Sequence, residues 1–150
     1  MFEDLRDLYQ EVILDHGRRP RHGARLAAFD ATAKGDNPMC GDRVQVFVRR
    51  DGAGRIAEVG FEARGCAISI ASADLMAETV AGLSAGEAQA LAARFRDMAR
   101  SGEGAGDDAA IERLRPLAGV HEFPSRVKCA TLPWHALLAA LDGKGEASSE

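Results

Sequence analysis

The stretch that decides the fold covers residues 43–66 and reads RVQVFVRRDGAGRIAEVGFEARGC. Valines recur at every second position over residues 44–48, which is the period of a β-strand with one buried face. Residues 51–54, Asp-Gly-Ala-Gly, predict a hairpin turn, and apolar residues over 56–61 predict a second strand. The stretch therefore predicts a hairpin that ends next to Cys66.

Helices are predicted on both sides of this hairpin. Apolar residues at steps of three and four over residues 2–16 predict a helix that Gly17 can terminate. After Cys66, residues 67–78 switch to helix formers at helical spacing, so Cys66 lies at a strand-to-helix junction. Ser84 begins a capping-box pattern for a further helix.

Other segments carry weaker patterns. We expect an edge strand within residues 23–34, a loop over 35–42, a flexible loop over 101–108 and a short helical piece over 111–117. An amphipathic final helix should contain Trp134 and end at Gly143. Because Pro133 is tolerated only in a first turn, this helix should start near Thr131 or be kinked there. Either choice places Cys129 at or near a helix N-terminus.

Composition places the chain among globular proteins. Its 150 residues are 46% hydrophobic and 28% charged, which suits one domain over residues 1–145 with a flexible tail at 146–150. With a net charge of -4, the chain as a whole does not attract the negative charges of nucleic acid or anionic lipid. We therefore expect no nucleic-acid partner and no membrane association. The first twenty residues are rich in charge, without an apolar run, and we expect a cytoplasmic protein.

The three cysteines all fall at junctions between elements. Cys40 lies in a Pro/Gly-rich loop, Cys66 follows a predicted strand, and Cys129 precedes or opens the last helix. Their separations do not match the paired knuckles of zinc fingers. If the junctions converge, Asp42 could complete a Cys3Asp tetrahedron that zinc accepts. The alternative is that the cysteines are small buried residues and Asp42 belongs to a turn. We expect His16, on the apolar face of the first helix, to be packed or hydrogen-bonded rather than a metal ligand.

Four ordered motifs resemble the U-type iron–sulfur cluster assembly proteins, the IscU/NifU N-domain superfamily, and within it the SufU branch. The motifs are LYQEVILDH at 8–16, NPMCGD at 37–42, GCAISIASA at 65–73 and FPSRVKCATLPW at 123–134. The resemblance covers nearly the whole chain. It implies an α+β fold with a small antiparallel sheet of about three strands packed against helices, and it maps Cys40, Asp42, Cys66 and Cys129 onto the metal-site positions of the family.

The resemblance also bears on function. Scaffolds similar to IscU carry a histidine before the third cysteine, where this chain has Lys128, and a chaperone-recruiting motif where it has residues 123–127. The resemblance to the SufU branch implies a zinc-bound sulfur acceptor that activates a PLP-dependent cysteine desulfurase of the SufS type within the Suf cluster-assembly machinery. Such a protein is a sulfur-transfer partner rather than a stand-alone enzyme. Cys40 would be the catalytic thiolate, freed because its loop can move more readily than a helix terminus.

Two alternatives remain at this point. The same residues could hold a transient [2Fe-2S] cluster that is passed to apoproteins, since thiolates are the usual ligands of such clusters. They could also form a structural zinc module that serves only for interaction. Cysteines on three separate segments with a replaceable aspartate favour a labile site over a closed structural one.

Overall fold

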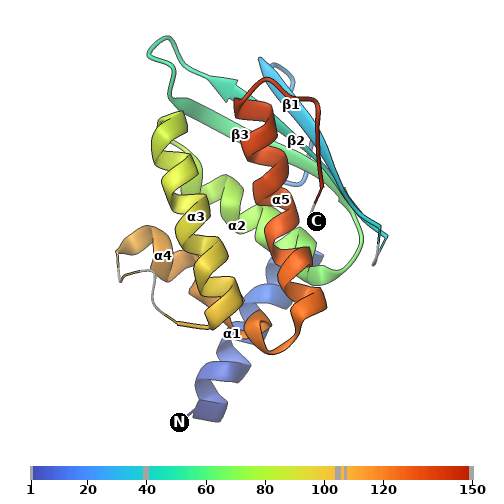
Figure 1. Ribbon diagram of the computed structural model, residues 1–150, viewed down its shortest axis with the longest axis vertical. Coiled ribbons are helices and arrows are strands. Elements are labelled where there is room, and N and C mark those ends of the chain that lie inside the picture. The colour runs from blue at the N-terminus through green and yellow to red at the C-terminus, as the bar shows by residue number, and fades with distance from the viewer. Residues whose placement is uncertain (1, 39–40, 104–105, 107, 149–150) are drawn as a thin grey trace.

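The computed structural model describes residues 2–38, 41–103, 106 and 108–148 (Figure 1). Its elements, in chain order, are α1 (Phe2–Arg18), β1 (Ala31–Asn37), β2 (Asp42–Arg50), β3 (Ile56–Arg64), α2 (Ala67–Val80), α3 (Ala85–Ser101), α4 (Ala109–Leu114), the 3-10 helix η1 (Arg115–Glu122), α5 (Pro124–Leu141) and β4 (Glu146–Ser148). None of the helices in these ranges is long and apolar enough to cross a membrane.

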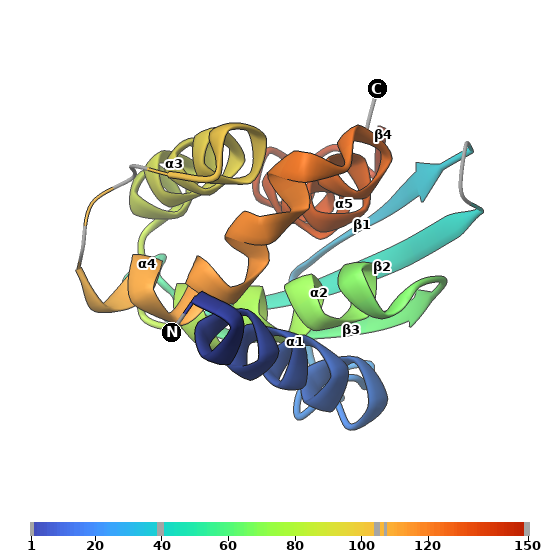
Figure 2. The same ribbon diagram turned by 90° about the horizontal axis from the view of Figure 1, so that it is seen from below.

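The predicted hairpin forms the centre of the sheet. Strands β2 and β3 pair antiparallel, with Val46 opposite Phe61 and Val48 opposite Val59, and all four side chains are buried. The order of the sheet is β3-β2-β1-β4. Helices α2 and α5 pack on one face of it, α1 packs along α2, and α3 lies against α5 (Figure 2). The mixed fold of a small sheet and helices is therefore confirmed.

Two expectations about strands need correction. The strand expected within residues 23–34 begins only at Ala31 and continues to Asn37, so the following loop is shorter than predicted. The tail expected at 146–150 instead forms β4 over residues 146–148, which pairs parallel with β1 and places β1 inside the sheet. The backbone groups of β1 that do not face β2 are available to a further strand. One of them, the N–H of Lys34, donates to the carbonyl of Gly145 at 2.9 Å. Backbone pairing of this kind does not depend on apolar side chains. The polar residues 146–148 therefore carry no pattern that predicts a strand.

Helix α5 begins at Pro124, so of the two expectations for Pro133 the start near Thr131 is wrong. Pro124 occupies its first turn, where a missing N–H costs nothing, and Pro133 lies inside the helix rather than at its start. Cys129 is consequently the sixth residue of α5 and not an N-terminal one. Pro133 cannot donate to the carbonyl of Cys129, four residues earlier, so that carbonyl can accept a hydrogen bond from elsewhere.

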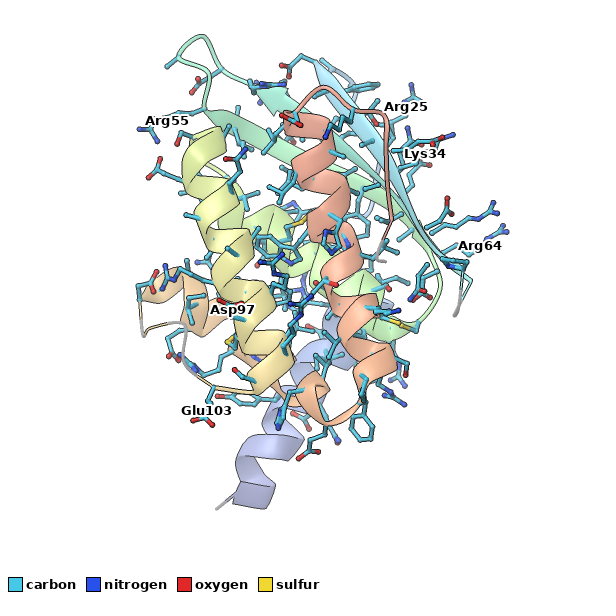
Figure 3. All side chains as sticks on the ribbon, viewed as in Figure 1. Arg25, Lys34, Arg55, Arg64, Asp97 and Glu103 are labelled. Atoms are coloured by element: carbon cyan, nitrogen blue, oxygen red, sulfur yellow. The ribbon has the colours of Figure 1, made fainter. Side chains whose placement is uncertain are left out.

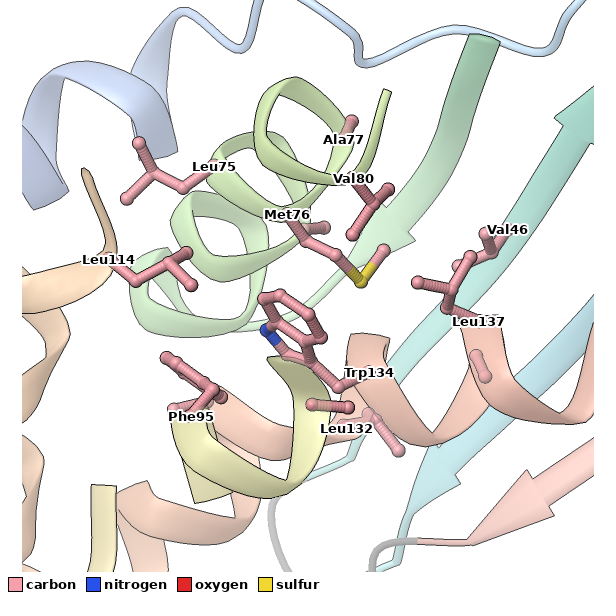
Figure 4. Packing of buried hydrophobic residues seen from close by; sticks show 14 of the residues in the cluster. Val46, Leu75, Met76, Ala77, Val80, Phe95, Leu114, Leu132, Trp134 and Leu137 are labelled. Atoms are coloured by element: carbon pink, nitrogen blue, oxygen red, sulfur yellow. The ribbon is translucent and has the colours of Figure 1, made fainter. Parts of the chain in front are cut away.

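The core lies between the sheet and the two helices that cover it. Met76 of α2, together with Trp134 and Leu137 of α5, packs towards Val46 of β2 (Figure 4). Phe95 of α3 stacks on Trp134 with ring centroids 4.9 Å apart, which ties the outer helix to the core. Burial of these side chains fixes α2 and α5 relative to β2.

Helix α1 is fastened to α2 by a polar contact. Asp74 of α2 is fully buried, and its carboxylate lies 2.5 Å from Nδ1 of His16 and accepts the backbone N–H of His22 at 2.8 Å. The expectation that His16 is hydrogen-bonded is therefore confirmed. Because both carboxylate oxygens are used, Asp74 holds the end of α1 and the segment after it on the same helix.

Candidate metal centre

Three segments that are far apart in the sequence meet at one end of the sheet. Asp42 is the first residue of β2, Cys66 is the N-cap of α2, and Cys129 lies in the second turn of α5. One ligand atom from each lies within 4.8 Å of the others. The structure thus brings these three residues together. Cys40, predicted as the fourth ligand and catalytic thiol, lies outside the described residues.

Asp42 is held by donors on α2. Its Oδ1 accepts the backbone N–H of Cys66 at 2.9 Å, and its Oδ2 accepts the hydroxyl of Ser69 at 2.9 Å. Burial alone would raise the pKa of Asp42, but hydrogen bonds from Cys129, from Cys66 and from Ser69 together lower it below the usual value. The result is an ionised carboxylate in a position that is only 1% exposed.

The two described thiols differ in their surroundings. Cys66 is exposed and is the N-cap residue of the 14-residue helix α2. Cys129 is 3% exposed, and its Sγ lies 3.5 Å from the carbonyl of Ser125. Cys129 lies in the second turn of α5, beyond the helix N-terminus at or near which it was expected. The site therefore has one thiol open to solvent and one enclosed.

The donor set fits a zinc ion. Bonds of about 2.3 Å to sulfur and about 2.0–2.2 Å to oxygen place tetrahedral ligand atoms roughly 3.5–3.8 Å apart. Sγ of Cys66 and Oδ2 of Asp42 are 3.6 Å apart. The ligand atoms of Asp42, Cys66 and Cys129 lie within 4.8 Å of one another, so a tetrahedral ion bound by all three would have one further position, which Cys40 is expected to fill.

Charged and aromatic residues lie close in the chain to the candidate ligands. Arg64, labelled in Figure 3, is exposed two residues before Cys66, and Arg126 is exposed one helical turn before Cys129. The guanidinium of Arg126 lies 5.3 Å from the ring centre of Phe123, which is 51% exposed. This pair presents an aromatic and a cationic group to solvent at the start of α5.

Two residues in these clusters were not predicted from the sequence. Ser69 appeared only as part of a helix-forming stretch, and its role depends on the packing of α2 against β2 and α5. Asp74 was missed for the same reason, and together with His16 and Glu78 it forms the second group of clustered ligand atoms. In that group the carboxylate of Asp74 is already occupied by donors from α1 and the segment after it.

The sequence pattern described as "NifU-like N terminal domain" matches residues 8–141, and the chain belongs to this family. The U-type superfamily indicated by the four motifs is thereby confirmed. An "Iron-sulfur cluster assembly scaffold protein IscU" of Streptococcus pyogenes serotype M1 is 39% identical over 91% of this chain and 84% of its own. A "Zinc-dependent sulfurtransferase SufU" of Bacillus subtilis is 37% identical over 89% of each chain.

A solved structure agrees with this assignment. The chain is similar to a putative iron–sulfur cluster assembly scaffold protein for the SUF system from Fervidobacterium islandicum, with a TM-score of 0.78 and 32% sequence identity. The match covers 87% of this chain and 94% of the other. The fold class predicted from the resemblance is confirmed by this neighbour.

Gly65 provides a test of the carboxylate position. Its φ is +142°, and a Cβ added there would lie 2.0 Å from Oδ1 of Asp42. We expect Gly65→Ala to displace the Asp42 carboxylate and to weaken zinc binding at least tenfold, measured by competition with a chromophoric chelator. Gly82→Ala is the matched control, because Gly82 has φ +90° but nothing within 4 Å of an added Cβ. The control should lose roughly 1–2 kcal/mol of stability through backbone strain and keep its zinc affinity. Equal zinc affinities in the two variants would contradict the structure of the site.

Proposed function

We propose that this protein serves iron–sulfur cluster assembly as a zinc-bound sulfur acceptor that activates a SufS-type cysteine desulfurase, a PLP enzyme of the Suf machinery. The observation that carries the proposal is the convergence of Asp42, Cys66 and Cys129, whose ligand atoms lie within 4.8 Å of one another. The similarity to the zinc-dependent sulfurtransferase of B. subtilis supports it, since the two chains align over 89% of each.

Cys40, Asp42, Cys66 and Cys129 would hold the metal. Zinc, when bound, supplies a positive centre that favours thiolates over thiols. The backbone N–H of Cys66 and the hydroxyl of Ser69 keep the Asp42 carboxylate directed at the two thiols. Because the ligands come from separate segments, metal binding should also order these segments and stabilise the fold.

Cys40 is proposed as the residue that receives sulfur. Its thiolate attacks the terminal sulfur of the persulfide on the desulfurase cysteine. A bond forms between Sγ of Cys40 and that sulfur, while the sulfur–sulfur bond on the desulfurase breaks. The electron pair remains on the desulfurase cysteine as a thiolate. The step is an exchange between sulfur atoms that consumes no external oxidant or reductant.

A scaffold for a transient [2Fe-2S] cluster is the second candidate function. The S. pyogenes relative named as an IscU scaffold favours it, because its identity to this chain is as high as that of the sulfurtransferase. Cysteine thiolates can bind an iron–sulfur cluster, just as they can bind a zinc ion. Lys128, at the position where scaffolds similar to IscU carry a histidine, favours the sulfur acceptor, since a lysine ammonium has no free electron pair for a metal.

Replacement of Cys40 tests the sulfur-accepting role. We expect Cys40→Ala to abolish stimulation of a SufS-type desulfurase while the far-ultraviolet circular dichroism stays that of the folded protein. The physical reason is that alanine has no thiolate to attack the persulfide. Met39→Ala, which changes the neighbouring residue and keeps all four proposed ligands, should stimulate normally. Full stimulation by the Cys40 variant would remove Cys40 from the proposed role.

Arg126 is proposed to contact the desulfurase. It lies one turn before Cys129 and is exposed beside Phe123, so its charge is available to a partner that approaches the thiols. We expect Arg126→Ala to raise several-fold the concentration needed for half-maximal stimulation. Arg55→Ala is the charge-matched control, because the nine-residue strand β3 separates Arg55 from the metal centre. If Arg126→Ala leaves both the half-maximal concentration and the maximal rate unchanged, this role is wrong.

A further inference from the structure

Ser69 touches every described segment of the metal centre. It is the third residue of α2 and only 1% exposed. Its Oγ lies 2.9 Å from Oδ2 of Asp42, 3.1 Å from the backbone carbonyl of Cys129 and 3.8 Å from Sγ of Cys66. A single buried hydroxyl thus joins the first residue of β2, the start of α2 and the second turn of α5.

The carbonyl of Cys129 is within reach of Ser69 because of a proline. In a regular helix the N–H of residue 133 would donate to the carbonyl of residue 129, but Pro133 has no N–H. The carbonyl of Cys129 therefore accepts its hydrogen bond from a donor on α2, the hydroxyl of Ser69. Pro133 lies inside α5, and its missing N–H leaves the carbonyl of Cys129 available to accept the hydrogen bond from Ser69.

The hydroxyl of Ser69 has one proton for two acceptors. Asp42 is the ionised acceptor, and a hydrogen bond to a charged group is about twice as strong as one to a neutral carbonyl. The Cys66 N–H holds Oδ1 and the Ser69 hydroxyl holds Oδ2, each at 2.9 Å. Oδ2 is also the oxygen 3.6 Å from Sγ of Cys66, which makes it the oxygen placed to bind a metal.

We propose that Ser69 is a positioning residue of the metal centre, which orients Oδ2 of Asp42 towards the ion and thereby sets the affinity for zinc. The proposal rests on the zinc site of the proposed function. Partners of this kind, which hydrogen-bond a metal ligand, typically contribute 10–100-fold to metal affinity.

Ser72 offers a matched control on the same helix. It is buried like Ser69, and its hydroxyl donates to the carbonyl of Ala130, the next residue of α5, at 2.5 Å. Each serine therefore links α2 to α5 through a backbone carbonyl. Within the hydrogen bonds described for these residues, only Ser69 also reaches Asp42. Comparison of the two alanine variants separates the contact with Asp42 from the link between the helices.

The test measures zinc affinity by competition with a chromophoric chelator in the full chain. We expect Ser69→Ala to bind zinc about 10–100-fold more weakly, and Ser72→Ala to stay within a few-fold of the unchanged protein. Cobalt(II) should report the same difference, because a displaced carboxylate alters the visible ligand-field bands in Ser69→Ala and not in Ser72→Ala. Equal zinc affinities and equal cobalt spectra in the two variants would overturn the proposal.

A double-mutant cycle identifies the route of the effect. In an Asp42→Ala background, Ser69→Ala should cause no further loss of zinc affinity, because the group that it orients is gone. An undiminished loss in that background would show that Ser69 acts through Cys129 instead, and would overturn the assignment. A parent protein that binds no zinc in the same titration would instead overturn the proposed function, so the two failures are distinguishable.

Discussion

The hydrogen bond from the Cys66 N–H to the Asp42 carboxylate joins the beginning of β2 to the N-terminus of α2. Gly65 makes this contact possible, because any side chain at that position would collide with Oδ1 of Asp42. The chain leaves β3, turns at Gly65 with a backbone angle that favours glycine, and enters α2 with the backbone N–H of Cys66 pointing at the carboxylate. Asp42 and Cys66, two of the proposed ligands, are thereby fixed relative to each other by one turn.

Helix α5 brings the second described thiol to the same place. The stacked Phe95 and Trp134 rings and the apolar residues around them hold α5 against the sheet and α2. Pro133 breaks the regular ladder within this helix, and the serines of α2 supply donors to the carbonyls of Cys129 and Ala130. The core is therefore connected to the candidate metal centre through these buried hydrogen bonds between α2 and α5.

Much of this arrangement could be predicted from the sequence, and the exceptions have physical reasons. The alternating valines of β2, the turn at residues 51–54 and the capping box of α3, confirmed by the reciprocal bonds of Ser84 and Glu87, are local signals that tertiary contacts did not override. Strand β4 and the true start of α5 were missed because they depend on pairing and packing between distant segments. The motifs indicated Asp42, Cys66 and Cys129, whereas Ser69 acquires its role only where three elements meet.

The central claim is that this centre holds zinc on three thiolates and one carboxylate, and X-ray absorption at the zinc and iron edges tests it most directly. The sample is protein purified anaerobically from cells supplied with both metals. The account predicts one zinc per chain with three sulfur ligands at about 2.3 Å and one oxygen at about 2.0–2.2 Å. Iron with acid-labile sulfide in place of zinc, or zinc coordinated without sulfur, would contradict it.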